Sequence, residues 1–125
     1  TDRSRGLGDV YKRQEYLEEG KAITSSMIRK SIEREDELVT QCVSEASEYL
    51  SGGLASVINL INPELIILGG GLIEAVDYFY KQTIKKAKSK SLPVPAEKIR
   101  FSKTILGDYS GVIGAALLDE REEIL

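Results

Sequence analysis

The chain has 125 residues, with 17 Lys and Arg against 20 Asp and Glu, so its formal net charge is −3. It contains one Cys and no His, which excludes Ser-His-Asp triads, Cys-His pairs, histidine metal ligands, internal disulfides and Cys-x-x-Cys sites built from this chain alone. The length suits one domain, and the acidic balance gives no electrostatic reason to bind nucleic acid or a membrane surface.

Residues 1–14 show neither a helical nor a strand period. Such a segment is typical of a disordered leader. A second interpretation is that residues 9–14 (DVYKRQ) resemble the conceptual translation of a sequencing adaptor, in which case the gene continues upstream. We therefore expect residues 1–14 to be a leader unrelated to the fold, and residues 15–125 to form the domain.

Two amphipathic helices are predicted next. Thr24 is a good N-cap for the first, and Asp36 for the second. The second helix has apolar residues at three- and four-residue steps between positions 38 and 61, and Cys42 lies on this stripe, which predicts a buried thiol. The pair Gly52-Gly53 costs about 1 kcal/mol per glycine in a helix interior, so we expect it to allow close packing or the approach of a ligand.

The middle of the chain has the pattern of a βαβ unit. Residues 65–68 (LIIL) predict a buried strand, residues 72–87 a helix, and Ile99 and Phe101 a second strand. Pro93 and Pro95 between the helix and the second strand predict a loop. The lysines near position 85 are expected to form a solvated face at a helix end.

The last predicted helix begins near Asp108, which is first a candidate N-cap and only second a candidate for a phosphate or metal site. Gly111, Gly114 and Ala115 recur on one face of this helix, so that face is almost bare backbone. We expect another element to pack closely against it.

Gly69, Gly70 and Gly71, between the first strand and the helix after it, are the chief chemical signal. Glycines let a ligand reach the backbone, and such a turn can hold a nucleotide; it can equally be a tight turn without a ligand. A dinucleotide-binding fingerprint fails because Glu74 stands where its third glycine belongs. The P-loop and hydrolase-elbow patterns fail as well, since Gly20-Lys21 precedes Ala and Ser110 is one position late.

Three segments, in this order and spacing, resemble the C-terminal end of the ROK family of bacterial sugar kinases and sugar-responsive repressors: residues 53–64 (GLASVINLINPE), 65–71 (LIILGGG) and 106–116 (LGDYSGVIGAA). The resemblance covers roughly residues 15–125. It implies an α/β fold, the C-terminal portion of an actin-like (ribonuclease H-like) ATPase domain, with the βαβ unit flanked by helices.

The resemblance also implies a function for the parent protein, an ATP- and Mg-dependent hexose kinase such as a glucokinase. Gly69, Gly70 and Gly71 match the adenosine-side turn of the family, and Gly107 is a weaker candidate. The phosphate loop, the catalytic aspartate and the cysteine-rich zinc motif would lie upstream of residue 15. No catalytic or metal-binding residue is therefore assigned in this chain, and we expect the chain alone to be inactive.

Two alternatives stay open. ROK repressors share this part of the sequence and add an N-terminal DNA-binding motif, and a free-standing interaction module would have no nucleotide site at all. The family resemblance implies a homo-oligomer, and the absence of a signal peptide or a long apolar run favours a cytoplasmic protein. Which sugar is bound is left open.

Overall fold

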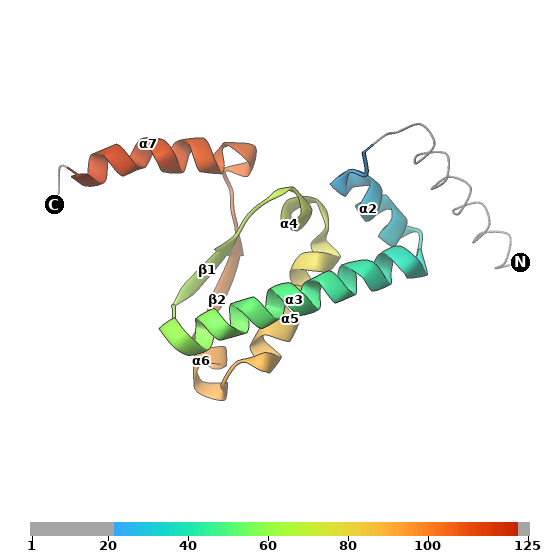
Figure 1. Ribbon diagram of the computed structural model, residues 1–125, viewed down its shortest axis with the longest axis horizontal. Coiled ribbons are helices and arrows are strands. Elements are labelled where there is room, and N and C mark those ends of the chain that lie inside the picture. The colour runs from blue at the N-terminus through green and yellow to red at the C-terminus, as the bar shows by residue number, and fades with distance from the viewer. Residues whose placement is uncertain (1–21, 123–125) are drawn as a thin grey trace, which may run out of the picture.

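The computed structural model describes residues 22–122, and side chains as far as residue 118. The fold is α/β and mostly helical, as expected, with a small two-stranded sheet (Figure 1). In chain order the elements are α2 (Ser25–Glu33), α3 (Glu37–Ile61), β1 (Leu65–Leu68), α4 (Gly71–Ala75), α5 (Asp77–Lys90), α6 (Pro93–Lys98), β2 (Arg100–Lys103), the 3-10 turn η1 (Gly107–Tyr109) and α7 (Ser110–Glu122).

The two predicted N-caps are confirmed. The Thr24 hydroxyl accepts from the Met27 N–H at 3.3 Å, and the Met27 sulfur accepts in return from the Thr24 N–H. The Asp36 carboxylate accepts from the Val39 N–H at 3.1 Å. Helix α3 then runs unbroken through the paired glycines and ends at Asn62, whose left-handed backbone (φ 51°) suits a C-cap. Local capping chemistry therefore sets where both helices begin.

The two strands pair in parallel, with Leu65 opposite Arg100 and Leu68 opposite Lys103. Helices α4 to α6 form the crossover between them, which confirms the predicted βαβ unit. The expectation of a fully buried first strand is wrong in this chain, because Leu65 is 43% exposed and Ile67 is 61% exposed. Among residues 22–122, helices cover one face of the sheet and leave Leu65 and Ile67 on the other face exposed.

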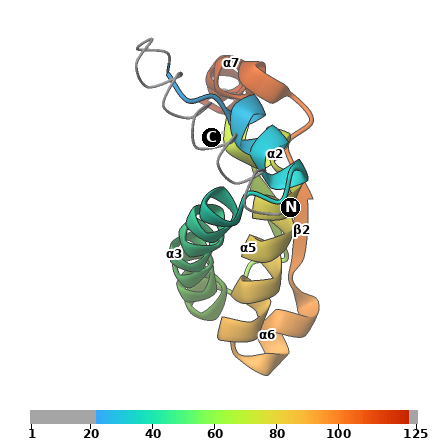
Figure 2. The ribbon, with the colours of Figure 1, turned by 90° about the vertical axis from the view of Figure 1, so that its right-hand side faces the viewer.

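Two apolar clusters hold the helices on that covered face. The first contains Val43, Ile73, Val76 and Phe79, and the second contains Ile58, Ala87 and Ile99. Residues of the strands also pack on these clusters: Leu68 on the first, and Ile66 and Phe101 on the second. The sheet and the α3–α5 pair therefore form a two-layer unit (Figure 2).

A polar seam runs between α3 and α5. Ser47, Ser51 and Thr83 are fully buried in it. The ammonium of Lys86 reaches across from α5 and donates to the Ser44 carbonyl at 2.8 Å and to the Ser47 hydroxyl at 2.8 Å. The side chain of Lys86 is only 17% exposed, so the predicted solvated lysine face is wrong for this residue.

Other sequence predictions are corrected by the structure. The predicted helix over residues 72–87 is divided at Val76 into α4 and α5, and the expected proline loop is the short helix α6. Asp108 lies inside η1 and does not cap α7. Cys42 is exposed because its side of α3 has no neighbour among the described residues.

Candidate functional site

The four glycines predicted to bind a nucleotide meet at one edge of the sheet. Gly69, Gly70 and Gly71 follow β1 directly, and Gly107 follows β2 after three residues. The strands are parallel, so their carboxyl ends lie side by side (Figure 1). This edge is where open α/β sheets bind their ligands. The structure therefore brings the predicted residues together into two adjoining turns.

Gly69 is required by close packing between these turns. A Cβ atom at this position would stand 3.0 Å from Cγ2 of Thr104, the residue that follows β2. The Thr104 N–H also donates to the Leu68 carbonyl at 2.8 Å, which extends the ladder by one bond beyond the strands. Gly69 therefore serves the contact between the turns and leaves little room for a ligand on that side.

Gly70 and Gly71 are the accessible part of the turn. Gly70 has φ +111°, a conformation that favours glycine, and a Cβ there would meet nothing within 4 Å. At Gly71 the nearest atom to an added Cβ is the Ser25 hydroxyl at 4.0 Å. Both residues are exposed. Their backbone is therefore open to a flat ligand that would lie against it.

The second turn is tied by two hydroxyls. The Thr104 and Ser110 hydroxyl oxygens lie 2.9 Å apart and share a hydrogen bond. The Ser110 hydroxyl also lies 2.7 Å from the carbonyl of Gly107, to which it can donate, and Gly107 has φ +55°. This arrangement fixes η1 beside the first turn. Sequence reasoning missed Thr104 and Ser110, although the position of Thr104 directly after a parallel strand mirrors that of Gly69 and could have indicated it.

The charges near these turns are negative. The Glu74 carboxylate lies 3.9 Å from where a Cβ of Gly107 would stand, and Asp108 is exposed beside it. The nearest basic residue along the chain, Lys103, is already paired with Asp77 at 2.9 Å and lies over the ring of Tyr80. A triphosphate would be repelled here, whereas an uncharged nucleoside would not. The acidic surroundings therefore disfavour the phosphates of a nucleotide at these turns.

Two lysines stabilise the charged form of the Asp77 carboxyl at the start of α5. Hydrogen bonds from Lys81 and then from Lys103 lower the pKa of the Asp77 carboxyl to about 2. Hydrogen bonds from Lys90 and then from Lys86, both in α5, lower the pKa of the Glu48 carboxyl in α3. Both carboxylates are ionised at neutral pH and hold α5 in place. They do not belong to the candidate site.

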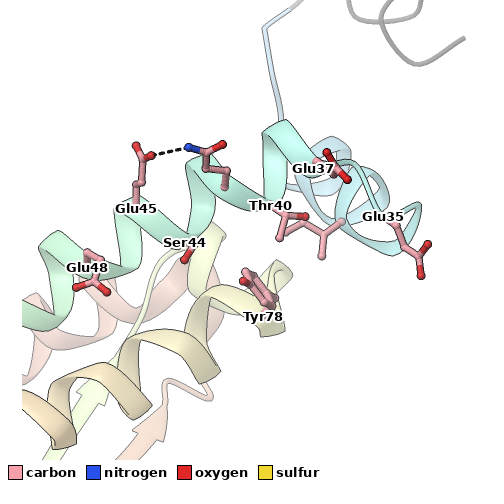
Figure 3. A pocket seen from close by; sticks show the side chains of 9 residues that line it. Glu35, Glu37, Thr40, Ser44, Glu45, Glu48 and Tyr78 are labelled. Carbon is pink, nitrogen blue, oxygen red and sulfur yellow. Dashed lines mark hydrogen bonds between the residues drawn. The ribbon is translucent and has the colours of Figure 1, made fainter. Parts of the chain in front are cut away.

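A shallow groove of about 600 Å³ lies elsewhere, between α2, α3 and α5 (Figure 3). Glu35, Glu37, Glu45 and Glu48 line it, together with Tyr78 from α5. Glu48 is paired with Lys86 and Lys90 of α5, and Glu45 accepts from the Gln41 amide at 3.1 Å. None of the predicted glycines lines this groove, so it is separate from the candidate site.

Residues 22–122 lack two features that other classes of function would need. No cluster of three or more acidic or cysteine side chains there is placed to hold a metal ion. No helix in that range is both long and apolar enough to cross a bilayer.

Comparison with known proteins decides the family. The model of the ROK family matches residues 5–122. The chain belongs to the ROK family. The match begins at residue 5, inside the expected leader, and ends at residue 122. The structure describes no residue before 22, so the expected boundary between residues 14 and 15 stays a prediction.

The relatives of this ROK chain are named either as sugar kinases or as a transcriptional repressor. It is 29% identical over 101 residues to a glucokinase of Halalkalibacterium halodurans, which covers 81% of this chain and 31% of that protein. It is 33% identical over 100 residues to an N-acetyl-D-glucosamine kinase of Histophilus somni, covering 80% and 32%. It is 24% identical over 101 residues to the DNA-binding transcriptional repressor Mlc of Escherichia coli, covering 81% and 25%. The chain thus spans at most about a third of the length of these relatives.

A solved structure supports the same family. It is a ROK family transcriptional regulator described as a homologue of the Escherichia coli Mlc protein, with a TM-score of 0.58 and 28% identity, covering 66% of this chain and 21% of that one. Relatives named as kinases and relatives named as repressors therefore both match this part of the family sequence. The family implies an actin-like ATPase fold. The α/β unit described here is consistent with one part of such a fold.

Proposed function

We propose that the parent protein is an ATP-dependent hexose kinase, and that this chain supplies the adenosine side of its nucleotide cleft. The observation that carries the proposal is the meeting of four glycines at the carboxyl edge of two parallel strands, next to an acidic rather than a basic environment. Relatives named glucokinase and N-acetyl-D-glucosamine kinase support the sugar kinase class.

In this proposal each residue of the turns has a separate task. Gly70 and Gly71 offer their exposed backbone to the nucleoside, and Gly69 keeps that turn against Thr104. In the second turn, the Ser110 hydroxyl bonds to the Gly107 carbonyl and so helps to hold Gly107 in its left-handed conformation. ATP itself would supply the phosphoryl group, with Mg neutralising its charge. The groups that orient the sugar hydroxyl would come from the rest of the parent protein.

The test uses the complete parent enzyme and an assay that couples ADP release to NADH oxidation. Gly71→Val places a branched side chain against the bound nucleoside, at a position whose own backbone needs no left-handed φ. We expect the KM for ATP to rise at least about 10-fold while the KM for the sugar changes little. Gly52→Ala, at an open position in the middle of α3, is the matched control and should leave both constants unchanged.

Glucose and N-acetyl-D-glucosamine should be compared as substrates, because relatives of both kinds match the chain. No phosphorylation of either, or an unchanged KM for ATP in the Gly71→Val enzyme, would overturn the assignment. The 125-residue chain alone should produce no glucose 6-phosphate from ATP and glucose. Phosphorylation by the chain alone would show that its own residues suffice for catalysis.

A repressor is the second candidate, favoured by the solved ROK transcriptional regulator and by the similarity to Mlc. A repressor parent would bind operator-like DNA with an affinity that changes when sugar is added. Its DNA binding should be insensitive to Gly71→Val unless it retains a nucleotide site. An interaction module without nucleotide would show neither phosphorylation nor DNA binding in the same experiments.

The remaining expectations apply to the parent protein as a whole. We expect a homo-oligomer, a cytoplasmic location, and a structural zinc ion held by cysteines in the part of the polypeptide before residue 15. The mass of the parent in solution and its zinc content by elemental analysis test the first and third of these. Cys42 is a poor zinc ligand because no other acidic or cysteine cluster forms around it among residues 22–122.

A further inference from the structure

The second turn of the candidate site carries exposed apolar side chains. Tyr109, the last residue of η1, is 71% exposed, and Ile105, which follows Thr104, is 95% exposed. Single exposed apolar residues are common on protein surfaces. These two, however, lie in one short connection between β2 and α7, at the end of the sheet where the glycines meet. An exposed aromatic ring at such a place indicates a surface that a flat apolar ligand would cover.

Tyr109 differs from the other aromatic residues between positions 22 and 122. Four of these pack in or against the two apolar clusters: Tyr78, Phe79, Tyr80 and Phe101. Tyr49 is 84% exposed, but it lies in the middle of α3, outside both turns. Within this part of the chain, Tyr109 is therefore the one aromatic residue that stands at the carboxyl edge of the sheet and has no apolar cluster to pack in.

Hydrogen bonds fix the backbone that carries the Tyr109 ring. The Tyr109 N–H donates to the Leu106 carbonyl at 3.2 Å. The Leu106 N–H in turn donates to the Thr104 hydroxyl at 3.3 Å. On the other side of Tyr109, the Ser110 hydroxyl lies 2.7 Å from the Gly107 carbonyl, to which it can donate. A ring on a fixed backbone loses only the freedom of its two side-chain torsions when it binds, so a ligand can cover it at a small cost in entropy.

The element that carries Tyr109 adjoins the glycine turn after β1. η1 packs beside α4, whose first residue is Gly71, and the Glu74 carboxylate of α4 lies 3.9 Å from where a Cβ of Gly107 would stand. The exposed backbone of Gly70 and Gly71 and the exposed ring thus belong to neighbouring elements at one end of the sheet (Figure 1). The negative charge of Glu74 disfavours phosphates here, whereas an uncharged aromatic base suits both the open backbone and the ring.

We propose that the Tyr109 ring stacks on the base of the bound nucleotide, and that it makes the site prefer a purine to a pyrimidine. Stacking strengthens with the area of the two rings that overlap, and a purine offers two fused rings where a pyrimidine offers one. Tyr109 is then a specificity-determining residue, while Gly70 and Gly71 contribute only their backbone. This inference rests on the proposed function, because it assigns a residue to the nucleotide cleft described there.

The experiment uses the complete parent enzyme and probes the two halves of ATP separately. Adenosine, cytidine and inorganic triphosphate are each measured as competitive inhibitors against ATP in the same coupled assay. For Tyr109→Leu we expect the KM for ATP and the inhibition constant of adenosine to rise at least about fivefold, with that of triphosphate unchanged. The constant of cytidine should rise less, because its base is smaller. Tyr109→Phe keeps the ring and should match the unaltered enzyme in every measurement.

Tyr49→Leu is the matched control, since it removes a similarly exposed ring outside the turns and should leave the KM for ATP unchanged. Equal losses for adenosine and triphosphate in Tyr109→Leu would overturn the inference, because they would indicate a general change in the fold. Equal losses for adenosine and cytidine would overturn the purine preference. If Gly71→Val raises the KM for ATP and Tyr109→Leu does not, the inference fails and the proposed function stands. If neither variant raises it, both fail.

Discussion

The contact between Gly69 and Thr104 gives the sharpest test of the candidate site. An Ala at position 69 would place its Cβ 3.0 Å from Cγ2 of Thr104, well inside the optimum carbon–carbon separation of about 3.5–4.0 Å. Overpacking of this kind costs about 1–3 kcal/mol, and Ala recovers about 0.4–1 kcal/mol through the unfolded state. We expect Gly69→Ala to destabilise the chain by about 1–2 kcal/mol.

Thr104→Ser should relieve this clash. Ser lacks the methyl group that an Ala at position 69 would meet, but it keeps the hydroxyl that bonds to Ser110. The single substitution should cost about 0.8 kcal/mol for the lost methyl group. In the Thr104→Ser background, Gly69→Ala should be neutral or slightly stabilising. The cycle therefore predicts a coupling energy of about 1–2 kcal/mol between the two positions.

The assay is urea unfolding followed by far-UV circular dichroism, since the chain has no Trp and its structure is mostly helical. Gly52→Ala is the control, because an added Cβ there meets nothing within 4 Å in the interior of α3. It should stabilise by about 0.5–1 kcal/mol. The reasoning is refuted if Gly69→Ala costs the same with Thr or Ser at position 104.

Three further substitutions test the α3–α5 unit by the same measurement. Thr83 is fully buried and its hydroxyl has no hydrogen-bond partner among the residues that the structure describes, so Thr83→Val should stabilise by about 1 kcal/mol; a loss would mean that the hydroxyl is satisfied. Lys86→Met should destabilise by about 2–3 kcal/mol because its charged hydrogen bonds are lost. Lys85→Met, on the exposed side of α5, should change stability by less than about 0.5 kcal/mol. Equal effects would contradict the role of Lys86 in joining α5 to α3. The folded pKa of Asp77, about 2, is below its ordinary value, so its stabilisation is present above about pH 4 and lost as the pH falls through 2. Asp77→Asn should therefore lower the urea midpoint at pH 7 but not at pH 2, and an equal loss at both values would exclude a charge effect.

The helix starts and the pairing of the strands could be predicted because their causes are local or periodic. Thr24 and Asp36 carry the oxygens that cap the first turns of α2 and α3. The run LIIL followed by glycines specifies a strand and a turn, and parallel pairing then places Gly107 beside Gly69 without further information. The candidate site was therefore predictable once both strands were placed in one sheet.

The misassigned elements have physical reasons. Pro93 predicts a loop, but proline is also favoured in the first turn of a helix, where its missing N–H costs nothing, and Pro93 is the first residue of α6. The division at Val76 has no Gly or Pro to mark it. Lys86 was expected in solvent because a pattern does not show how far a long side chain reaches across to the next helix.

Burial was the least predictable property. Cys42, Leu65 and Ile67 have the pattern of buried residues and are exposed in this chain. A periodic pattern records which side chains are suited to leave water, but it does not say which element covers them. Gly111 and Gly114 in α7 show the same difference, since the expected close neighbour is absent among the described residues and that helix projects away from the sheet (Figure 1).

The parallel pairing of β1 with β2 also constrains the order of events during synthesis. The ladder joins Leu65 to Arg100, so β1 leaves the ribosome well before its partner, and the seam between Ser44 and Lys86 closes across 42 residues. Contacts between residues so far apart in sequence form slowly, because the loop must close before they stabilise anything. The nascent chain therefore carries LIIL without this partner strand until β2 has been made, and an unpaired apolar strand is prone to aggregate during that interval.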